Sequence, residues 1–459
     1  MTLNEHVLSL REPLIAALRE NLRIPSVEAA PVENAPYGEA VRRSLDHAAA
    51  TARSLGFDPV DVDGHVLWCE YGEGEEMVAV LGHLDVVPAG DGWTCDPFGG
   101  EYFDGRIWGR GATDDKGPSF AALFALAALR DSGLPLKRRV RLILGCNEET
   151  GSADLKYYKD QGGELPTMGF TPDGEYPVIN GEKGIITSVF SRVYTQEGEL
   201  ILQKIQGGTA GNVVPAHACA ELRCSRDLAD AIAQTELPHV TFRVTDFGLT
   251  VEAEGLSAHG STPELGENAI GRLLLALEKL PLCPEVWGPI HFLAQKIGME
   301  TGGESLGIAL RDDVSGGLSL NLGVLSGNET GLELKINYRY PVTKAYADCA
   351  PALNKTFSEE GFNLTQEFHK EGIFMPPESE LVQNLMDVYR RETGLDGTPK
   401  SIGGGTYAKM LPNTVAFGPI FPGEEIREHK ADEYISEESL LKNAQIIAQA
   451  MYALAKREE

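Results

Sequence analysis

The chain has 459 residues, of which 42% are hydrophobic and 24% are charged, values typical of a soluble globular protein with two or three domains. Its 68 acidic and 40 basic residues give a formal net charge of −28. Because such a surface repels phosphate backbones and anionic membranes, nucleic acid and membranes are excluded as expected partners.

Seven cysteines are scattered along the chain without a C-x-x-C pair, so neither a disulfide framework nor a zinc ribbon is indicated. Residues 1–23 mix leucine with glutamate and arginine and lack the apolar core of a signal peptide. The longest apolar run, Phe120 to Leu129, is too short to span a bilayer. These features predict a cytoplasmic protein.

A buried strand is predicted at Met77–Leu81, because an uninterrupted apolar run indicates that both faces of a parallel sheet are covered. His83 and Asp85 follow it, and at this spacing their side chains leave an extended chain on the same side. The carboxyl end of a strand is where α/β sheets keep their chemistry. A histidine with a nearby carboxylate suits a metal site, although such a pair alone is more often a turn or a cap.

Polar loops also follow the next two predicted strands. Strand Val140–Leu144 leads into the adjacent carboxylates Glu148 and Glu149, and strand Thr167–Phe170 leads into Asp173. Acidic loops after successive strands are expected to meet at one edge of a sheet.

A glycine-rich loop, Gly109–Pro118, carries Asp114 and opens a helix predicted at Ser119–Asp131. Strands that alternate with helices in this way predict a mostly parallel α/β sheet. Further helices are expected at Leu3–Leu22, at Ala40–Leu55, at Glu378–Glu392 and after the capping residue Ser436.

The pattern changes near Gly184. From residue 185 to 374 the chain alternates in short strand-like pieces, with one helix predicted at Asn268–Leu280. Helical periodicity then returns. We therefore expect an α/β domain of residues 1–184 and 375–459, with an α+β domain of residues 185–374 inserted into it.

Several polar residues at strand and loop ends form a candidate constellation. Two histidines with several carboxylates suit zinc, manganese or cobalt rather than calcium or copper. The adjacent glutamates are informative, because one can bind metal while the other stays free as a base, although an isolated pair is usually a solvated surface pair. The residues are His83, Asp85, Asp114, Glu148, Glu149, Asp173 and His429.

Five stretches resemble the motifs of a known family and follow that family's order. They are Gly82–Pro88, Gly109–Pro118, Asn147–Gly151, Pro172–Glu175 and His429–Glu433. The family is that of the co-catalytic metallopeptidases of the aminoacylase and carboxypeptidase G type. The resemblance is strongest to its bacterial dipeptidase V branch, the carnosinase-like Xaa-His dipeptidases. It implies a mostly parallel α/β metallopeptidase domain with an inserted α+β lid domain.

The resemblance also implies two divalent metal ions, Zn²⁺ first, with Mn²⁺ or Co²⁺ as alternatives. His83 and Asp173 would hold one ion, and Glu149 and His429 the other. Asp114 would bridge the two ions together with a water or hydroxide.

Catalytic roles follow from the same resemblance. Asp85 would orient the site from behind His83, and Glu148 would be the general base and acid. A cis peptide bond is implied after the bridging aspartate, between Asp114 and Asp115.

The lid has weaker signals. His259, in Ser257–Ser261, resembles a lid histidine that stabilises the oxyanion of the transition state. Asn212 and Arg339 resemble residues that hold the carboxyl end of the substrate, and an arginine suits a carboxylate by its bidentate geometry.

A glycine cluster in the last quarter of the chain offers backbone N–H groups for an anionic substrate end, with a plain tight turn as the alternative. Its candidate substrate-binding residues are Gly404, Gly405 and Thr406.

The predicted function is hydrolysis of the peptide bond of short peptides, above all dipeptides. One alternative is deacylation of N-acyl amino acids on the same scaffold. Another is a non-catalytic peptide-binding protein, against which the intact Glu148 argues. The long insert favours a monomer, with a lid-mediated homodimer as the alternative.

Overall fold

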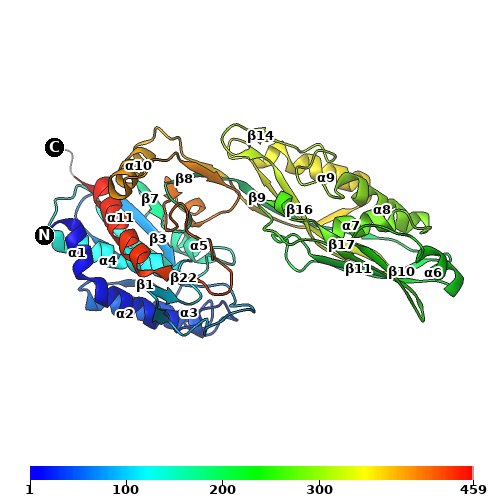
Figure 1. Ribbon diagram of the computed structural model, residues 1–459. Helices are drawn as coiled ribbons and strands as arrows, with labels where there is room; N and C mark the ends of the chain where they lie inside the picture. The colour runs from blue at the N-terminus through cyan, green and yellow to red at the C-terminus, as the bar shows by residue number, and fades with distance from the viewer. Residues whose placement is uncertain (457–459) are drawn as a thin grey trace. The chain divides into compact units, whose positions relative to one another are not determined.

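The computed structural model describes residues 1–456, and these divide into two compact units. The first unit comprises Met1–Asn180, Met375–Lys400 and the chain from Gly405 onward. The second comprises Gly181–Phe374 and Ser401–Gly404. Figure 1 shows that the first unit is built from both ends of the chain, drawn in blue to cyan and in orange to red.

The first unit is organised around a mixed sheet whose four central strands, in the order β6-β3-β7-β21, are parallel. Strands β2 and β8 flank them and are antiparallel to their neighbours, with β1 outside β2. The expected α/β sheet is therefore confirmed. The bounds are β1 Val60–Val62, β2 Val66–Tyr71, β3 Met77–His83, β6 Arg139–Gly145, β7 Met168–Thr171, β8 Ile179–Glu182 and β21 Thr414–Ala416. Strands β19 (Ile373–Phe374) and β20 (Lys400–Ile402) pair with β8, where the chain passes between the units.

Helix α4 lies in the middle of the first unit and contacts both helix α11 and strand β3. It is apolar all round and buried along most of its length, as expected of a helix packed on several sides. It ends at Gly133, whose φ of 65° is a left-handed conformation that suits glycine. The helices of this unit are α1 Leu3–Ser9, α2 Arg11–Leu22, α3 Glu39–Ser54, α4 Lys116–Ser132, α5 Ala153–Asp160, η3 Tyr407–Lys409, α10 Glu380–Thr393 and α11 Glu437–Ala455.

The helix predicted over Leu3–Leu22 is wrong in one respect, since the structure has two helices that meet at Leu10. Pro13 explains the break. In one continuous helix its ring would clash with the carbonyl group of Ser9, whereas in the first turn of a new helix proline is tolerated.

The register of the parallel strands determines where the loops lie. His83, the last residue of β3, is opposite Gly145, the last residue of β6. Val80 is opposite Phe170 of β7. The loops that follow these three strands therefore leave the sheet at the same edge.

A small antiparallel sheet in the order β22-β5-β4 joins two distant parts of the first unit. It pairs the residues just before the glycine-rich loop with those just after His429. The bounds are β4 Glu101–Phe103, β5 Arg106–Trp108 and β22 Tyr434–Ser436.

The second unit is an eight-stranded antiparallel sheet, in the order β12-β13-β11-β10-β16-β17-β9-β18, with a hydrophobic core of its own. Its strands are β9 Gly184–Val193, β10 Ile201–Gly207, β11 His217–Arg223, β12 Val240–Thr245, β13 Gly248–Glu254, β16 Ser319–Asn328, β17 Gly331–Tyr340 and β18 Asn363–Lys370, with a separate pair β14 Arg311–Asp312 and β15 Gly316–Gly317.

The sequence predicted one helix in this region, whereas the structure has four α-helices among its described residues. Helix α8 was missed because prolines at 284 and 289 interrupt its helical pattern, although the first stands at the tolerated N-terminal position. The helices are α6 Arg226–Ile232, η1 Pro263–Leu265, α7 Ala269–Leu277, α8 Pro284–Lys296, η2 Tyr346–Asp348 and α9 Ala350–Glu359.

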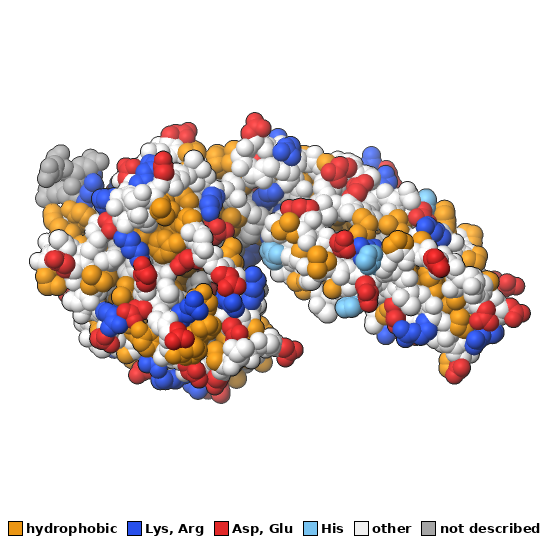
Figure 2. Space-filling model, viewed as in Figure 1, with side chains coloured by type: hydrophobic (Ala, Val, Ile, Leu, Met, Phe, Trp, Pro, Cys, Tyr) orange, Lys and Arg blue, Asp and Glu red, His pale blue; other side chains and the backbone are white. Residues whose placement is uncertain are grey.

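Within residues 1–456, no helix combines the length and the apolar character that crossing a membrane requires. Figure 2 shows acidic and basic side chains interspersed over both units. The excess of negative charge is therefore spread over the visible surface of each unit.

Candidate metal centre

One carboxylate lies between two histidines at the carboxyl edge of the first unit's sheet. His83 is completely buried, and its Nε2 lies 3.1 Å from Oδ1 of Asp114. The other oxygen of Asp114, Oδ2, lies 2.9 Å from Nε2 of His429. Asp114 therefore faces one imidazole with each oxygen, as a ligand shared by two cations does.

Two further carboxylates stand beside these histidines. Oδ2 of Asp173 is 3.9 Å from Nε2 of His83, and Oε2 of Glu149 is 3.2 Å from Nε2 of His429. The structure thus brings the five predicted metal ligands together from five separate segments of the chain.

The donor atoms of this cluster are better satisfied by cations than by hydrogen bonds to one another. Among residues 1–456, His83 Nε2 and Glu149 Oε1 are buried atoms without a hydrogen-bond partner. Asp114 lies close to His83 Nε2, but the contact does not have hydrogen-bond geometry. Ligand atoms of these three residues lie within 4.8 Å of one another, as do those of His83, Glu148 and Asp173. Imidazole and carboxylate donors in this number fit two ions such as zinc, manganese or cobalt.

The same crowding shifts pKa values in the metal-free protein. Burial acts to lower the pKa of His83, but Asp114 and Asp85 raise it well above its ordinary value. Partial desolvation opposes protonation of His429, whose side chain is 54% exposed, whereas Asp114 and Glu149 raise its pKa to about 11. The two histidines hold the pKa of Asp114 below its usual range despite burial. Protonated imidazoles therefore supply the positive charge that metal ions would otherwise bring.

The ring of His83 is oriented by its neighbour Asp85. Nδ1 of His83 lies 3.0 Å from the backbone carbonyl oxygen of Asp85. Because a carbonyl oxygen can only accept, Nδ1 carries the proton in this contact. Nε2, the atom that faces Asp114, is thereby left as the one that can bind a metal.

The carboxylate of Asp85 holds the backbone of the two adjacent glutamates. Its Oδ1 accepts from the N–H of Glu148 at 3.2 Å, and its Oδ2 accepts from the N–H of Glu149 at 3.1 Å. The glutamates lie on different sides of the cluster, since Glu149 groups with Asp114 and Glu148 groups with Asp173. Asp85 therefore fixes the loop on which both acids stand, besides orienting His83.

Asp115 is a functional residue that the sequence analysis did not single out. It follows Asp114 across a cis peptide bond, so the cis bond implied by the resemblance is confirmed. Its Oδ2 accepts from the backbone N–H of His83 at 3.0 Å and from the hydroxyl of Ser119 at 3.0 Å. The side chain thereby ties the glycine-rich loop to the end of β3.

Glu433 is a second residue to which the sequence analysis gave no role, although it closes the His429 motif. Its buried carboxylate accepts from the backbone N–H groups of Gly111, Thr113 and Asp114 at 3.1, 2.8 and 3.2 Å, and from Nη1 of Arg110 at 2.6 Å. Glu433 therefore fixes the loop that carries Asp114 to the segment that carries His429.

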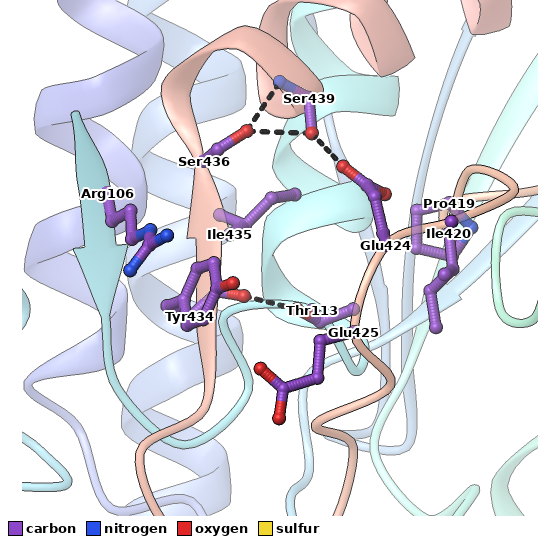
Figure 3. A pocket seen from close by; sticks show the side chains of 11 residues that line it. Arg106, Thr113, Pro419, Ile420, Glu424, Glu425, Tyr434, Ile435, Ser436 and Ser439 are labelled. Carbon is purple, nitrogen blue, oxygen red and sulfur yellow. Dashed lines mark hydrogen bonds between the residues drawn. The ribbon is translucent and has the colours of Figure 1, made fainter.

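A pocket of about 330 Å³ lies beside this junction, and Figure 3 shows it from close by. The hydroxyl of Thr113 donates to the backbone oxygen of Tyr434 at 2.8 Å across one wall. The guanidinium of Arg106 stacks 4.4 Å from the ring of Tyr434. None of the five predicted metal ligands lines this pocket, so it is separate from the metal centre.

The predicted residues of the second unit gather around a buried arginine. Nη1 of Arg339 donates to the carbonyl oxygen of Gly403 at 2.7 Å, and its Nε donates to Asn337 Oδ1 at 3.2 Å. Burial lowers the pKa of Arg339 to about 10. No carboxylate of residues 1–456 forms an ion pair with it.

His259 and Asn212 belong to the same part of the second unit. His259 is exposed, with Nδ1 2.6 Å from the hydroxyl of Ser261, and a side-chain carbon added to Gly403 would come within 2.7 Å of that serine. The carbonyl oxygen of Asn212 accepts from the N–H of Gly260 at 2.7 Å. The candidate oxyanion and carboxylate residues of the lid are thus neighbours.

The glycine cluster is divided between the units. Gly403 and Gly404 group with the second unit, whereas Gly405 and Thr406 group with the first. The hydroxyl of Thr406 accepts from the N–H of Ala408 at 3.1 Å and caps the short helix η3.

Comparison with known proteins gives consistent matches along the chain. Residues 79–453 match the model of peptidase family M20/M25/M40. The chain is 38% identical over 463 residues to a Bacillus subtilis protein named "Putative dipeptidase YtjP", which covers 98% of this chain and 99% of that protein. It is 34% identical over 468 residues to a "Putative dipeptidase" of Staphylococcus epidermidis, covering 98% of each.

Solved structures share the fold at lower identity. Human carnosine dipeptidase 1 is similar with a TM-score of 0.58 and 17% identity, covering 98% of each chain. The aminoacylhistidine dipeptidase of Vibrio alginolyticus is similar with a TM-score of 0.57 and 15% identity, covering 97% of each chain.

Proposed function

Because this chain belongs to peptidase family M20/M25/M40 and is a metallopeptidase, we propose that it hydrolyses dipeptides with two divalent metal ions, zinc in the first place. The observation that carries the proposal is Asp114, whose two oxygens face His83 and His429. His83 and Asp173 would hold one ion, Glu149 and His429 the other, and Asp114 both. When bound, the ions would lower the pKa of a water molecule and polarise the scissile carbonyl.

Glu148 is the proposed base. Its carboxylate lies within 4.8 Å of the ligand atoms of His83 and Asp173. Because Asp114 would be the ligand of both ions, Glu148 is left for proton transfer. Asp85 fixes the backbone N–H of Glu148, which supports a position for Glu148 beside the water that would attack the peptide bond. Glu148 takes the water's proton and returns it to the leaving amine.

The second unit is the proposed lid and supplies the substrate contacts. Arg339 is buried without an acidic partner among the described residues, and a buried cation in this state gains strongly from an anion. The substrate's carboxylate would supply that anion, with Asn212 and Gly404 of the same unit as further proposed contacts. Gly405 and Thr406 are the proposed substrate-binding residues of the first unit. His259 would donate to the oxyanion that forms in the transition state.

The test is a hydrolysis screen of the protein loaded with zinc, manganese or cobalt, against dipeptides, tripeptides, C-terminally amidated dipeptides and N-acetyl amino acids. Dipeptides with free termini should give the highest kcat/KM. Preferential cleavage of N-acetyl amino acids would assign the deacylase activity instead. Cleavage of none of these classes with any metal would contradict the proposal.

A further inference from the structure

The loop that carries Glu148 and Glu149 is held by a buried pair outside the set of predicted site residues, Tyr407 and Asp154. We propose that this pair is a positioning element for the base, and that the hydroxyl of Tyr407 is needed for turnover although it touches no substrate. The inference rests on the proposed function, because it concerns the placement of Glu148.

Four consecutive backbone N–H groups of this loop are bound by two carboxylates. Oδ2 of Asp154 accepts from Cys146 at 2.5 Å and from Asn147 at 2.9 Å. The next two N–H groups, those of Glu148 and Glu149, are held by Asp85. Asp154 therefore fixes the first half of this segment, and the second half contains Glu148 and Glu149.

Tyr407 holds Asp154 in this position. Its hydroxyl donates to the same oxygen, Oδ2, that accepts the two backbone N–H groups. Its ring lies edge-on to His83, with ring centroids 6.0 Å apart and planes at 83°. Tyr407, which is fully buried, thus contacts the candidate ligand His83 with its ring and Asp154 with its hydroxyl.

The end of β6 is shaped to admit this pair. A side-chain carbon on Gly145 would lie 2.0 Å from the Tyr407 hydroxyl oxygen and 2.4 Å from Asp154 Oδ2. Any other residue at position 145 would therefore expel the tyrosine or the aspartate. The glycine that precedes the Cys146–Glu149 loop is explained by the pair.

Asp154 is costly to bury, which indicates a requirement for its position. It is fully buried, and no basic side chain among residues 1–456 forms an ion pair with it. Burial and the nearby charge of Asp85 raise its pKa to about 6. A neutral side chain would avoid this cost, but an asparagine amide could not accept from Cys146, Asn147 and Tyr407 with the same atom and the same charge.

Tyr407 is also the first residue after the glycine cluster, at the start of η3. The segment proposed to hold the substrate's anionic end and the loop proposed to hold the base are therefore joined by one hydrogen bond. A displacement of either segment would be transmitted to the other through Asp154.

The experiment compares Tyr407→Phe with a matched control, Tyr158→Phe. Both tyrosines are buried in the same hydrophobic cluster. The Tyr158 hydroxyl donates to the carbonyl oxygen of Glu164 at 2.9 Å and accepts from Nη1 of Arg141 at 3.0 Å, so it does not contact the loop of Glu148 and Glu149. Tyr407→Phe should lower kcat by about 10- to 100-fold with KM near the wild-type value, as losses of supporting contacts around metal sites do. Tyr158→Phe should leave both constants unchanged.

A second readout does not depend on turnover. In the metal-free protein, amide hydrogen exchange in the peptide containing residues 146–149 should accelerate by about tenfold in Tyr407→Phe and not in Tyr158→Phe. Asp154→Asn, measured in the same way, should reproduce both effects of Tyr407→Phe, and it decides the question if Tyr407→Phe does not fold.

The possible results separate the two proposals. If the wild-type enzyme cleaves dipeptides while Tyr407→Phe and Asp154→Asn match it in kcat and in exchange, the positioning role is wrong and the proposed function stands. If wild type cleaves none of the tested substrates, the proposed function fails, and exchange alone then decides whether the pair holds the loop.

Discussion

The two units of the molecule build their candidate sites from opposite charges. In the first unit, Asp114, Glu149 and Asp173 crowd around two histidines and leave buried acceptor and donor atoms unsatisfied. In the second unit, Arg339 is buried with only neutral acceptors around it. The first site therefore depends on protonated histidines or on metal ions for its positive charge, and the second lacks an anion.

This difference indicates which partner each site requires. Buried charge without a counter-charge is costly, so each cluster is stabilised by what it binds. Under the proposed function, metal ions would satisfy the first cluster throughout turnover, whereas a substrate carboxylate would satisfy the second only while substrate is bound. Changes in the first unit should therefore alter chemistry or metal affinity, and changes at Arg339 should alter substrate affinity.

The largest effect is expected from Glu148→Ala. Removal of the base should lower kcat by at least about 10²–10⁴-fold, since proton transfer then has no positioned acceptor. Two metal ions per chain should remain bound, as measured by elemental analysis after gel filtration. A variant that loses its metals and regains activity when they are resupplied would show that Glu148, not Glu149, is the ligand.

His259→Ala should have the next largest effect. The donor is proposed to meet an oxyanion that exists only in the transition state, so kcat should fall by about 10²–10³-fold with little change in KM. Steady-state kinetics on a dipeptide would measure both constants. His239→Ala, on the same unit but without a proposed role, is the control, and equal rates for His259→Ala and wild type would remove His259 from the mechanism.

Arg339→Ala should act mainly on KM rather than on kcat. Loss of a charge-assisted contact with the substrate carboxylate should raise KM by about 10- to 100-fold and leave kcat less affected. Amidated dipeptides, which lack that carboxylate, should be poor substrates for wild type and no worse for the variant. Arg243→Ala removes an exposed arginine that pairs with Glu252 and should change neither constant.

The smallest effect concerns the pH dependence of stability in the chelated protein. In the metal-free protein the pKa of His429 is raised from an ordinary 6.5 to about 11. Its contribution to stability is therefore complete below about pH 6.5 and is lost as pH rises toward 11. Urea unfolding of the chelated protein from pH 6.5 to 10 should show this loss, and His429→Gln should flatten it.

Metal binding should also release protons near neutral pH, because the raised pKa values mean that both histidines bind metal only after losing a proton. Calorimetry in buffers of different ionisation enthalpy measures the number released. Chelation should leave the circular dichroism of the folded protein in place, since the sheet has its own core. A chelated protein that unfolds, or metal binding without proton release, would contradict this account.

The candidate ligands that end a strand or begin a loop could be predicted from the sequence, because strand periodicity is local and parallel strands end at one edge. His83, Asp114 and Asp173 were accessible in this way. Glu433 and Asp154 were not, since their partners Asp114 and Tyr407 lie far away in the chain and only the folded structure pairs them.

The same reasoning explains the errors in secondary structure. The junction at Leu10 and helix α8 both depend on how a proline is placed within a helix. Proline interrupts a helical pattern in the sequence equally at a helix start and in a helix interior. Its tolerance at a helix start becomes apparent only when the position of that start is known.

The insertion of the second unit has a consequence for biosynthesis. Strand β7 pairs with β21, and the candidate metal centre includes His429, but roughly 190 residues of the second unit are made in between. At the usual rates of synthesis this interval lasts on the order of ten to forty seconds. Throughout it, the growing chain holds the base and most of its ligands with one sheet edge unpaired and one histidine missing. Under the proposed function, the nascent chain would therefore be unable to hydrolyse peptides until the segment with His429 has been made, and until then the β7 edge that later pairs with β21 is exposed.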